Sequence, residues 1–374
     1  MILTSIELTD FRNYQNAALE LSSGNNFFIG DNAQGKTNLL EAIYLLCLSK
    51  SFRTNHEKEA IQFSEQEFIL KGEFLLDNKN VQKIVFSCSQ NKGKQISINR
   101  KRLSKISELI GNFPVVISSP EEYNLTLGPP PERRKFVDIL LSQIYKRYFY
   151  FLQEYHRVVK QRNSILLDWK LSGLKSSAIL EPWDEKLVQV GSDLIAYRFQ
   201  FSKTFSELLS HIYSQFVINN ETLKFEYNSN INFEDIAEIQ KRFRDKLGKI
   251  RRSEIQRGTS MAGPHRDDFI FKINDKGMKK FGSRGQHKTV LISLVIAESN
   301  LIEEKKHEKP VILIDDLYSE LDINRQKKIL DLLNEMGQIF ITSTSVHNHR
   351  KKNKEDKYFF ISKGIVAPEE ELMS

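Results

Sequence analysis

The residues that point most directly to chemistry form the segment GDNAQGKT at positions 30–37. Its two glycines, followed by Lys36 and Thr37, match the phosphate-binding pattern G-x-x-x-x-G-K-[ST]. The glycines let the backbone curl so that successive N–H groups point at one place, and a helix beginning there adds partial positive charge. Lys36 would neutralise the outer phosphates, and the Thr37 hydroxyl would hold a magnesium ion that bridges them. The segment therefore predicts a polyphosphate site.

The flanking sequence predicts the strand and the helix that such a loop requires. Residues 26–29 form a short apolar strand that leads into the loop. The apolar residues after the loop repeat at helical spacing and predict an amphipathic helix: Leu39, Leu40, Ile43 and Leu46. A glycine turn before an ordinary helix is the alternative, which is disfavoured because the full eight-residue pattern stands in the expected strand-loop-helix setting.

Two acidic residues follow a second short strand, predicted at 311–314. The all-apolar sequence VILI fits the middle of a parallel sheet. A carboxylate at its carboxyl end would lie beside the phosphate loop, where Asp315 can hold the magnesium shell. Asp316, one position further, can position and polarise the attacking water. Two acids that merely end a strand in a polar loop are the alternative, which the presence of a phosphate loop disfavours.

A second candidate anion site lies at 281–286, where the segment FGSRGQ precedes a long amphipathic helix that runs through Ile302. Small residues at a helix start expose several backbone N–H groups. In isolation this motif is a weak signal. Its position, 25 residues before the strand at 311–314, strengthens the prediction of an anion site.

Composition narrows the class of protein. A chain of 374 residues with 40% hydrophobic content suits one large or two medium domains. The net charge of +7 favours nucleic acid or another polyanion as a partner, although proteins without such partners share this balance. Cys47 and Cys88 fit neither a disulfide nor a metal framework, which indicates a reducing compartment. We find no signal peptide and no membrane-spanning run, so we expect a cytoplasmic protein.

Strand patterns dominate both ends of the chain and helical patterns its middle. Strands are predicted at 1–9, 17–21, 67–76, 81–89, 94–99, 114–117, 223–227, 269–273, 338–342 and 358–367, the last as a hairpin. From about 132 to 217 the period is helical and aromatic residues are frequent. The sequence therefore predicts an α/β head formed by residues 1–125 and 259–374, with a mainly helical domain, 126–258, inserted between them.

Two segments leave alternatives open. Just ahead of the phosphate loop, Arg12 could contact a nucleotide by charge and Tyr14 by stacking, or both could belong to a turn and the core. The helix predicted at 233–257 carries one apolar stripe, and seven of the twelve residues from 241 to 252 are basic and lie off that stripe. Such a row could track a phosphate backbone, but a solvated helix face explains the same facts.

Taken together, four segments resemble the phosphate loop, signature motif, magnesium strand and D-loop of the ABC-type ATPase superfamily, in that order: GDNAQGKT, FGSRGQ, VILIDD and SELD. Lys36 and Asp315 are 279 positions apart, farther than in transporter members of the superfamily. The helical insert accounts for the additional length and resembles the SMC-like branch.

Over essentially its full length the chain is similar to the RecF family. The stretches that carry this resemblance are FRNY (11–14), SPEEYNLTLGPPPERRKFVD (119–138), GPHRDD (263–268), SRGQHK (283–288) and DDLYSELD (315–322).

The resemblance implies a fold and a function. The fold would be an ABC-type ATPase head, with a mixed sheet around the phosphate loop, an antiparallel β meander and an inserted helical domain. The function would be that of a nucleoid-associated, ATP-dependent recombination mediator that dimerises on ATP and binds double-stranded or gapped DNA. With RecR and RecO it would promote RecA loading in DNA replication, repair and the SOS response. Weak, DNA-stimulated ATP hydrolysis would reopen the dimer.

The resemblance also assigns roles to residues. ATP would be bound by Arg12, Gly30, Asp31, Asn32, Ala33, Gln34, Gly35, Lys36, Thr37 and Asn38. Thr37 and Asp315 would hold Mg²⁺, and Lys36, Asp315 and Asp316 would be catalytic. The γ-phosphate of the ATP held by the other subunit would be contacted by Ser283, Arg284, Gly285 and Gln286, with Asp322 coupling the two sites. Asp316 stands where transporters usually have glutamate, which fits slow turnover.

Two departures from the transporter pattern accompany this resemblance. The segment 341–344, ITST, offers only hydroxyls where transporters carry a switch histidine, and 119–121, SPE, stands where they carry a lobe-linking glutamine. Both departures suit RecF-like proteins.

Four other functions remain as alternatives. The helical insert and the missing histidine argue against a transporter ATPase subunit. An ATPase fused to a nuclease would need a further acidic cluster, and only 52 residues follow Asp322. An SMC-like ATPase with another DNA-maintenance role, and a module that merely holds ATP, complete the set.

Overall fold

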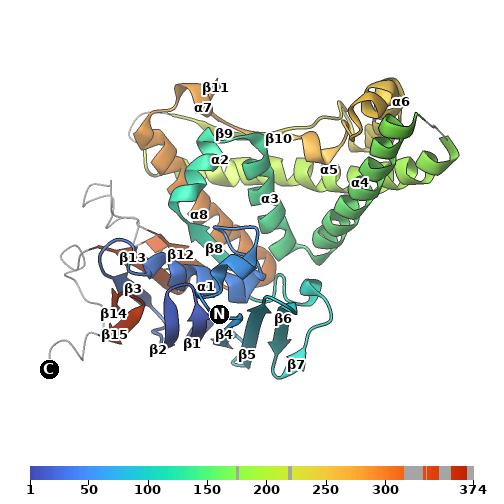
Figure 1. Cartoon of the computed structure of the whole chain (residues 1–374). Helices are drawn as coiled ribbons and strands as arrows, with labels where there is room; N and C mark the ends of the chain where they lie inside the picture. Colours follow the sequence, from blue (N-terminus) through green and yellow to red (C-terminus); the bar gives the residue numbers. More distant parts are fainter. Residues whose placement is uncertain (174–176, 218–220, 316–331, 334, 345–354, 369–374) are drawn as a thin grey trace. The chain divides into compact units, whose positions relative to one another are not determined.

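The computed structural model describes residues 1–173, 177–217, 221–315, 332–333, 335–344 and 355–368. The chain divides into two compact units, one formed by Met1–Glu122 with Leu294–Ser374 and the other by Tyr123–Ser293 (Figure 1). In the described part of the chain, no helix is both long and apolar enough to cross a lipid bilayer.

A six-stranded sheet of the first unit carries the phosphate loop. Its strand order is β15-β14-β3-β13-β12-β8, and every neighbouring pair is parallel except β14 and β15. The strands are β3 (Asn25–Ile29), β8 (Val115–Ser118), β12 (Val311–Ile314), β13 (Ile339–Ser343), β14 (Lys357–Ser362) and β15 (Ile365–Pro368). Strands β3, β12 and β13 are buried at every residue, which explains the continuous apolar sequence of β12 and the apolar runs 27–29 and 339–341 in the other two. Their shared direction brings the ends of β3 and β12 to one edge, as predicted.

The second sheet of this unit is an antiparallel meander in the order β2-β1-β4-β5-β6-β7. Its strands are β1 (Ile2–Phe11), β2 (Tyr14–Glu20), β4 (Glu67–Leu75), β5 (Val81–Ser89), β6 (Gly93–Ile98) and β7 (Lys101–Arg102). In β4 the side chains alternate, with Phe68, Leu70 and Phe74 buried. The alternating sequence thus gave a half-buried sheet with the predicted strands.

Helix α1 (Lys36–Leu48) lies between these two sheets and contacts strands of both. All ten residues from Leu39 to Leu48 are buried, including Glu41. The prediction of an amphipathic helix with one apolar face is therefore wrong, because two sheets cover the helix from different sides. The fit on β4 is close: a Cβ added to Gly72 would lie 2.8 Å from Cδ1 of Leu46.

The second unit is mainly helical. Its helices are α2 (Tyr123–Leu127), α3 (Pro130–Ile144), α4 (Lys146–Ser172), α5 (Ser177–Ser214), α6 (Ile239–Arg257) and α7 (Met278–Phe281), and α8 (Arg284–Lys306) begins in this unit and ends in the first. Short 3-10 helices lie in this unit at Ile236–Glu238 and Pro264–Arg266, and in the first unit at Glu57–Ala60, Ile106–Glu108 and Pro120–Glu122. The helical character predicted for 132–217 is confirmed.

A three-stranded sheet, β11-β10-β9, completes the second unit. It consists of β9 (Leu223–Asn228), β10 (Asp268–Ile273) and β11 (Lys276–Gly277). The domain boundaries expected from the sequence, 1–125, 126–258 and 259–374, differ from the compact units on the C-terminal side. Strand β10, expected in the head, pairs antiparallel with β9 over six residue pairs, so this strand belongs to the helical unit.

Two of the family-specific segments meet inside the second unit. Arg133, from the segment 119–138, forms a bidentate pair with Asp268, from the segment 263–268: Nε to Oδ1 is 2.8 Å and the second nitrogen to Oδ2 is 3.0 Å. Asp267 is fully buried and accepts hydrogen bonds from the Tyr227 hydroxyl and, at 2.6 Å, from the Asn230 backbone N–H. These motif residues hold α3 against β10 and β9, which gives them a structural role.

Two carboxyl groups of the first unit, Glu298 and Glu122, have pKa values raised by loss of water. Glu298, on α8, is 7% exposed, and burial raises its pKa well above the ordinary value, with the charge of Glu122 adding to the shift. Loss of water likewise raises the pKa of Glu122 to about 8. Both carboxyls also act on the buried Tyr44, whose pKa is raised chiefly by its own burial. This region of the core therefore favours uncharged acids.

We predict that Glu298→Gln changes how stability depends on pH. The folded protein keeps a proton on Glu298 that the unfolded chain releases near a pKa of about 4.3. Wild-type stability is therefore complete below that pH and is lost as pH rises towards the raised folded pKa. Glutamine has the same shape but cannot ionise, so the Tm advantage of the variant should grow as pH is raised from about 5 to about 9.

Thermal melts across this pH range test the prediction. The matched control is Glu7→Gln, which removes an exposed carboxylate paired with Lys71. A Tm difference between Glu298→Gln and wild type that stays constant with pH would contradict the assignment.

Candidate nucleotide site

A cavity of about 480 Å³ in the first unit is lined by the phosphate loop and by the carboxyl ends of β12 and β13. Its lining residues are Asn32, Ala33, Gly35, Lys36, Thr37, Asn38, Arg53, Pro120, Asp315, Thr342 and Thr344. The volume is within the range of small-molecule sites. Seven of the twelve head residues predicted for ATP, magnesium or catalysis line this cavity; of the other five, Asp316 lies outside the described residues.

The phosphate loop curls around the Lys36 ammonium group. The Nζ atom donates to the carbonyl oxygens of Gly30 and Asp31, at 2.5 and 2.7 Å. Gly35 has φ of 121°, a conformation that favours glycine, and a Cβ at Gly30 would lie 2.2 Å from the carbonyl oxygen of Ile361. Both pattern glycines are therefore required by the geometry. The ammonium group lies inside the curve of the loop, where a phosphate group would meet it.

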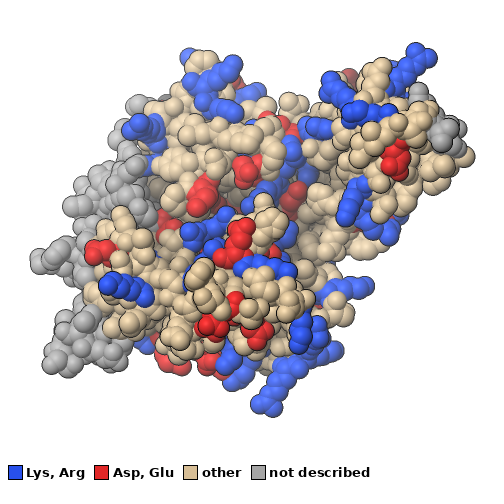
Figure 2. All heavy atoms as spheres, in the orientation of Figure 1, with Lys and Arg blue, Asp and Glu red and all other residues tan. Residues whose placement is uncertain are grey.

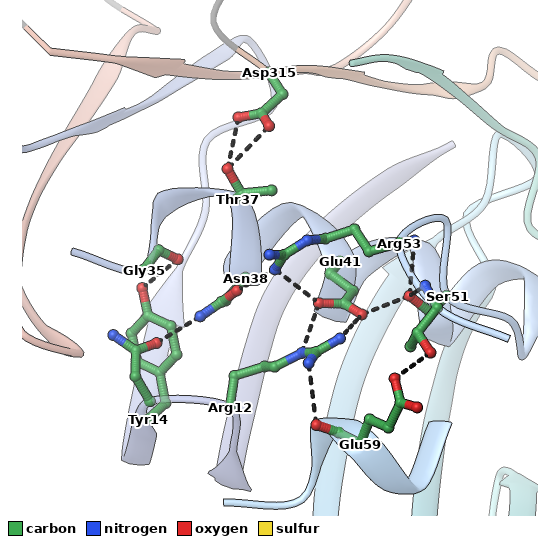
Figure 3. Close-up of polar contacts among 12 residues, drawn as sticks. Arg12, Tyr14, Gly35, Thr37, Asn38, Glu41, Ser51, Arg53, Glu59 and Asp315 are labelled. Carbon is green, nitrogen blue, oxygen red and sulfur yellow. Dashed lines mark hydrogen bonds and ion pairs between the residues drawn. The ribbon is translucent and has the colours of Figure 1, made fainter. Parts of the chain in front are cut away.

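Thr37 and Asp315 form the oxygen-rich wall of the cavity. The Thr37 hydroxyl lies 2.9 Å from each carboxylate oxygen of Asp315, as Figure 3 shows. The Thr342 hydroxyl at the end of β13 donates to Oδ1 of the same carboxylate at 2.7 Å. Mg²⁺ takes oxygen ligands and is usually held by one or two carboxylates together with substrate phosphates and water. A hydroxyl beside a carboxylate fits Mg²⁺, with Thr37 and Asp315 as the residues that would hold it.

Among the described residues, no group of three or more His, Cys, Asp or Glu side chains is placed to hold a metal ion.

The FRNY segment supports the phosphate loop from outside. The Asn13 side-chain amide donates to the carbonyl oxygen of Gln34 at 2.8 Å, and the Tyr14 hydroxyl donates to that of Gly35 at 2.9 Å. Asn38 donates to the Asn13 side-chain oxygen at 2.7 Å. Tyr14 is fully buried, so the option that its ring stacks on a nucleotide is wrong. Burial raises the pKa of Tyr14, which keeps the hydroxyl protonated as a donor.

The C-terminal hairpin holds the same part of the loop. The backbone N–H of Gly364 donates to the carbonyl oxygen of Gln34 at 3.1 Å, and the N–H of Lys363 donates to the Gln34 side-chain oxygen at 2.7 Å. A Cβ at Gly364 would lie 2.0 Å from the carbonyl oxygen of Asn13. Segments from both ends of the chain therefore fix the carbonyl groups of Gln34 and Gly35, in the loop that lines the cavity.

Arg12 is placed differently from its predicted role. Its guanidinium forms a bidentate pair with Glu41, at 2.9 and 2.7 Å, and donates to the backbone carbonyl of Glu59 at 3.0 Å (Figure 3). Arg12 is not among the residues that line the cavity, and its contact with a nucleotide stays a prediction.

Arg53 is the arginine that lines the cavity, and no sequence pattern pointed to it. Its guanidinium donates to the Asn38 side-chain oxygen at 2.6 Å and to Glu41 at 3.4 Å. The Glu41 carboxylate also accepts a hydrogen bond from the Ser51 hydroxyl at 2.5 Å. Glu41 therefore joins Arg12 to Arg53, and through this carboxylate the FRNY segment orients a cation at the cavity wall.

The predicted signature residues lie in the second unit, at the start of α8. Ser283 and Gln286 form a reciprocal cap: the Ser283 N–H donates to Oε1 of Gln286 at 2.8 Å, and the Gln286 N–H donates to the Ser283 hydroxyl at 3.2 Å. Ser283, Arg284 and Gly285 are exposed, and a Cβ at Gly285 would meet nothing closer than 4.0 Å. Their role toward a second subunit stays a prediction. Asp316 and Asp322 lie outside the described residues.

Comparisons with known proteins agree with this fold. A family model described as the RecF/RecN/SMC N terminal domain matches residues 2–366. Solved Smc head domains have the same fold, with a TM-score of 0.54 at 14% identity. The fold is therefore the ABC-type ATPase head predicted from the sequence.

More similar proteins identify the branch. The DNA replication and repair protein RecF of Clostridium novyi is 37% identical over 367 residues, which cover 98% of this chain and 99% of the relative. RecF of Streptococcus gordonii is 38% identical over 366 residues, or 98% and 100% of the two chains. A structure of the recombination mediator protein RecF with ATP, in the RecFOR pathway, has a TM-score of 0.91 at 34% identity and covers 98% of this chain and 97% of that one. The chain belongs to the RecF family, which confirms the predicted resemblance.

We predict that Tyr14→Phe weakens ATP binding while the protein stays folded. The change removes the hydroxyl that holds the Gly35 carbonyl, a buried hydrogen bond worth about 1 kcal/mol, so the Kd for ATP should rise roughly fivefold. Titration calorimetry with ATP and Mg²⁺ measures this. Tyr150→Phe, at a ring that is 62% exposed, is the control and should bind like wild type. Equal affinity of both variants would show that Tyr14 does not position the loop.

We predict that Glu41→Ala destabilises the fold strongly. Glu41 is fully buried, and its removal leaves Arg12 without its carboxylate partner. Breaking a buried ion pair on one side should lower the free energy of unfolding by about 3 kcal/mol or more. Urea unfolding measures the loss, with Glu7→Ala as the control: this exposed partner of Lys71 should cost about 1 kcal/mol at most. The prediction is wrong if both variants lose the same small amount.

Proposed function

We propose that this protein is an ATP-dependent, DNA-binding recombination mediator that dimerises when ATP and Mg²⁺ bind and reopens after slow hydrolysis. The observation that carries the proposal is the cavity in which Lys36, Thr37 and Asp315 meet. Its ammonium, hydroxyl and carboxylate groups complement a triphosphate with a divalent cation. The RecF relatives named DNA replication and repair proteins, and the RecF structure with ATP, support the same function.

The residues at the cavity would have different roles in nucleotide binding and hydrolysis. Lys36 would bind the outer phosphates, and the loop N–H groups would bind the rest. Thr37 and Asp315 would hold a magnesium ion, which would supply positive charge against the phosphates. Asp316 would orient and polarise the water for hydrolysis. Asn13 and Tyr14 would act as positioning residues, because their hydrogen bonds go to the loop carbonyls.

Dimerisation would complete the site. Ser283, Gly285 and Gln286 of one copy would contact the γ-phosphate bound at Lys36 of the other, and Asp322 would couple the two sites. The γ-phosphate would close the dimer, and its loss on hydrolysis would reopen it. Exposure of Ser283, Arg284 and Gly285 supports this role. Hydrolysis would be weak and stimulated by DNA.

The partners follow from the RecF relatives. Double-stranded or gapped DNA would bind the closed dimer through its phosphate backbone, by charge and shape more than by base sequence. RecR and RecO would then act with the protein to promote RecA loading in repair and the SOS response, at the nucleoid in the cytoplasm.

Three variants test the switch by light scattering with ATP and Mg²⁺. Lys36→Ala should abolish ATP binding and stay monomeric. Ser283→Arg should bind ATP as a monomer but not dimerise, because its loop is intact while the partner-facing contact is blocked. Asp316→Asn should bind ATP and accumulate as a dimer, because it cannot hydrolyse the bridging γ-phosphate. An Asp316→Asn protein that binds ATP yet stays monomeric would contradict the proposal.

A further inference from the structure

Helix α6 has one face that packs against the other helices of the second unit and one face that is exposed. Ile239, Phe243, Leu247 and Glu254 are buried, and the helix contacts α4 and α5. The opposite side carries five exposed residues, four of them basic: Lys241, Arg244, Gly248, Lys249 and Arg252. Lys241, Arg244, Gly248 and Arg252 follow one another at intervals of three or four residues, about one helical turn, and Lys249 stands next to Gly248. We call these five residues the basic face. Figure 2 shows basic side chains gathered over α6, at the upper right.

Among the described residues, the four cations of the basic face lack partners, in contrast to two other arginines of the same helix. On the same helix Arg242 pairs with Glu238 and Arg251 pairs with Asp184, and Arg198 pairs with Asp138 elsewhere in the unit. In the part of the chain that the structure describes, no ion pair or hydrogen bond joins a side chain of the basic face to another group. One carboxylate, Asp245, is exposed on the same side, so the face keeps a clear positive excess.

Gly248 gives the second, independent observation. It lies in the middle of α6, where glycine destabilises a helix relative to alanine. A Cβ added there would meet no atom within 4 Å, so no packing contact of the described residues requires glycine. Another reason for glycine at such a position is that a ligand approaches the backbone closely. Arg244 and Arg252 stand one turn to either side, so the exposed backbone at Gly248 is flanked by two unpaired guanidinium groups.

We propose that the basic face of α6 binds the phosphate backbone of duplex DNA, with one strand of phosphates passing over Gly248 between Arg244 and Arg252. Four cations spread over about 16 Å of helix can each reach a different phosphate. The face carries no aromatic side chain, which disfavours base stacking on single strands. The same lack of aromatic and apolar side chains disfavours a protein partner, since protein interfaces rely on such anchors. The inference rests on the DNA-binding function proposed above and assigns a surface to it.

The first test removes charge. Arg244→Gln/Arg252→Gln is compared with Arg242→Gln/Arg157→Gln, which removes two charges that are already paired, with Glu238 and Glu154. Fluorescence anisotropy with a labelled mixed-sequence duplex, on the full chain with ATP and Mg²⁺ from 50 to 200 mM salt, gives the Kd and its salt dependence. We expect the first variant to bind about tenfold more weakly, with the slope of log K against log salt reduced by about 1.8. The control should change less than about twofold, and ATP affinity should be unchanged in both.

The second test separates binding from stability. Gly248→Gln places a side chain where the backbone would approach phosphate, but glutamine is the better helix former. The variant should therefore have a raised Tm and a weakened duplex affinity, a combination that a purely structural glycine would not give.

The results that would overturn the proposal are distinct from those that would overturn DNA binding itself. Wild-type affinity and salt slope in both basic-face variants would remove α6 from the DNA site, while the proposed function would stand. A wild-type protein that binds no duplex in any nucleotide state would overturn both. Poly-L-glutamate serves as the acidic-polypeptide probe: loss of its binding in Arg244→Gln/Arg252→Gln, with duplex binding retained, would make the face a protein site.

Discussion

The phosphate loop depends on hydrogen bonds that hold its carbonyl groups from behind. A curled loop needs backbone angles that residues other than glycine rarely adopt, as at Ala33 with φ of 63°, and such a loop persists where neighbouring groups fix it. Here the amide of Asn13, the hydroxyl of Tyr14 and the N–H of Gly364 take the carbonyls of residues 34 and 35. These bonds hold the backbone of the loop that lines the cavity. The anion site is therefore built by contacts among three segments that are far apart in the chain.

Helix α1 connects this loop to the rest of the first unit. Helix α1 is buried between two sheets, so the residues that follow Lys36 cannot shift without disturbing both. The same helix supplies Glu41, which joins Arg12 to Arg53 at the cavity wall. Stability and nucleotide binding thus share residues. In the second unit, by contrast, the ion pair of Arg133 with Asp268 holds α3 against β10, and the four cations of the basic face lie exposed on α6.

Local sequence predicted most of the elements and the centre of the site. Period and composition located the strands of both sheets, and the spacing from Gly30 to Thr37 predicted the loop beside Asp315, which the cavity confirms. Three features were not predictable this way. The burial of α1 on all sides, the pairing of β10 with β9, and the position of Arg53 each depend on contacts between distant segments. Arg12 illustrates the same limit: its charge suggested a phosphate, but a buried carboxylate at Glu41 is its partner.

The central claim is that triphosphate at the Lys36 loop joins two copies of the chain. The most direct measurement is the mass of the unaltered protein in solution, by gel filtration with light scattering, in the presence of ATP and Mg²⁺ and of ADP and Mg²⁺. The account predicts twice the 43.6 kDa of one chain with ATP and the mass of one chain with ADP. The same mass in both nucleotides would contradict it.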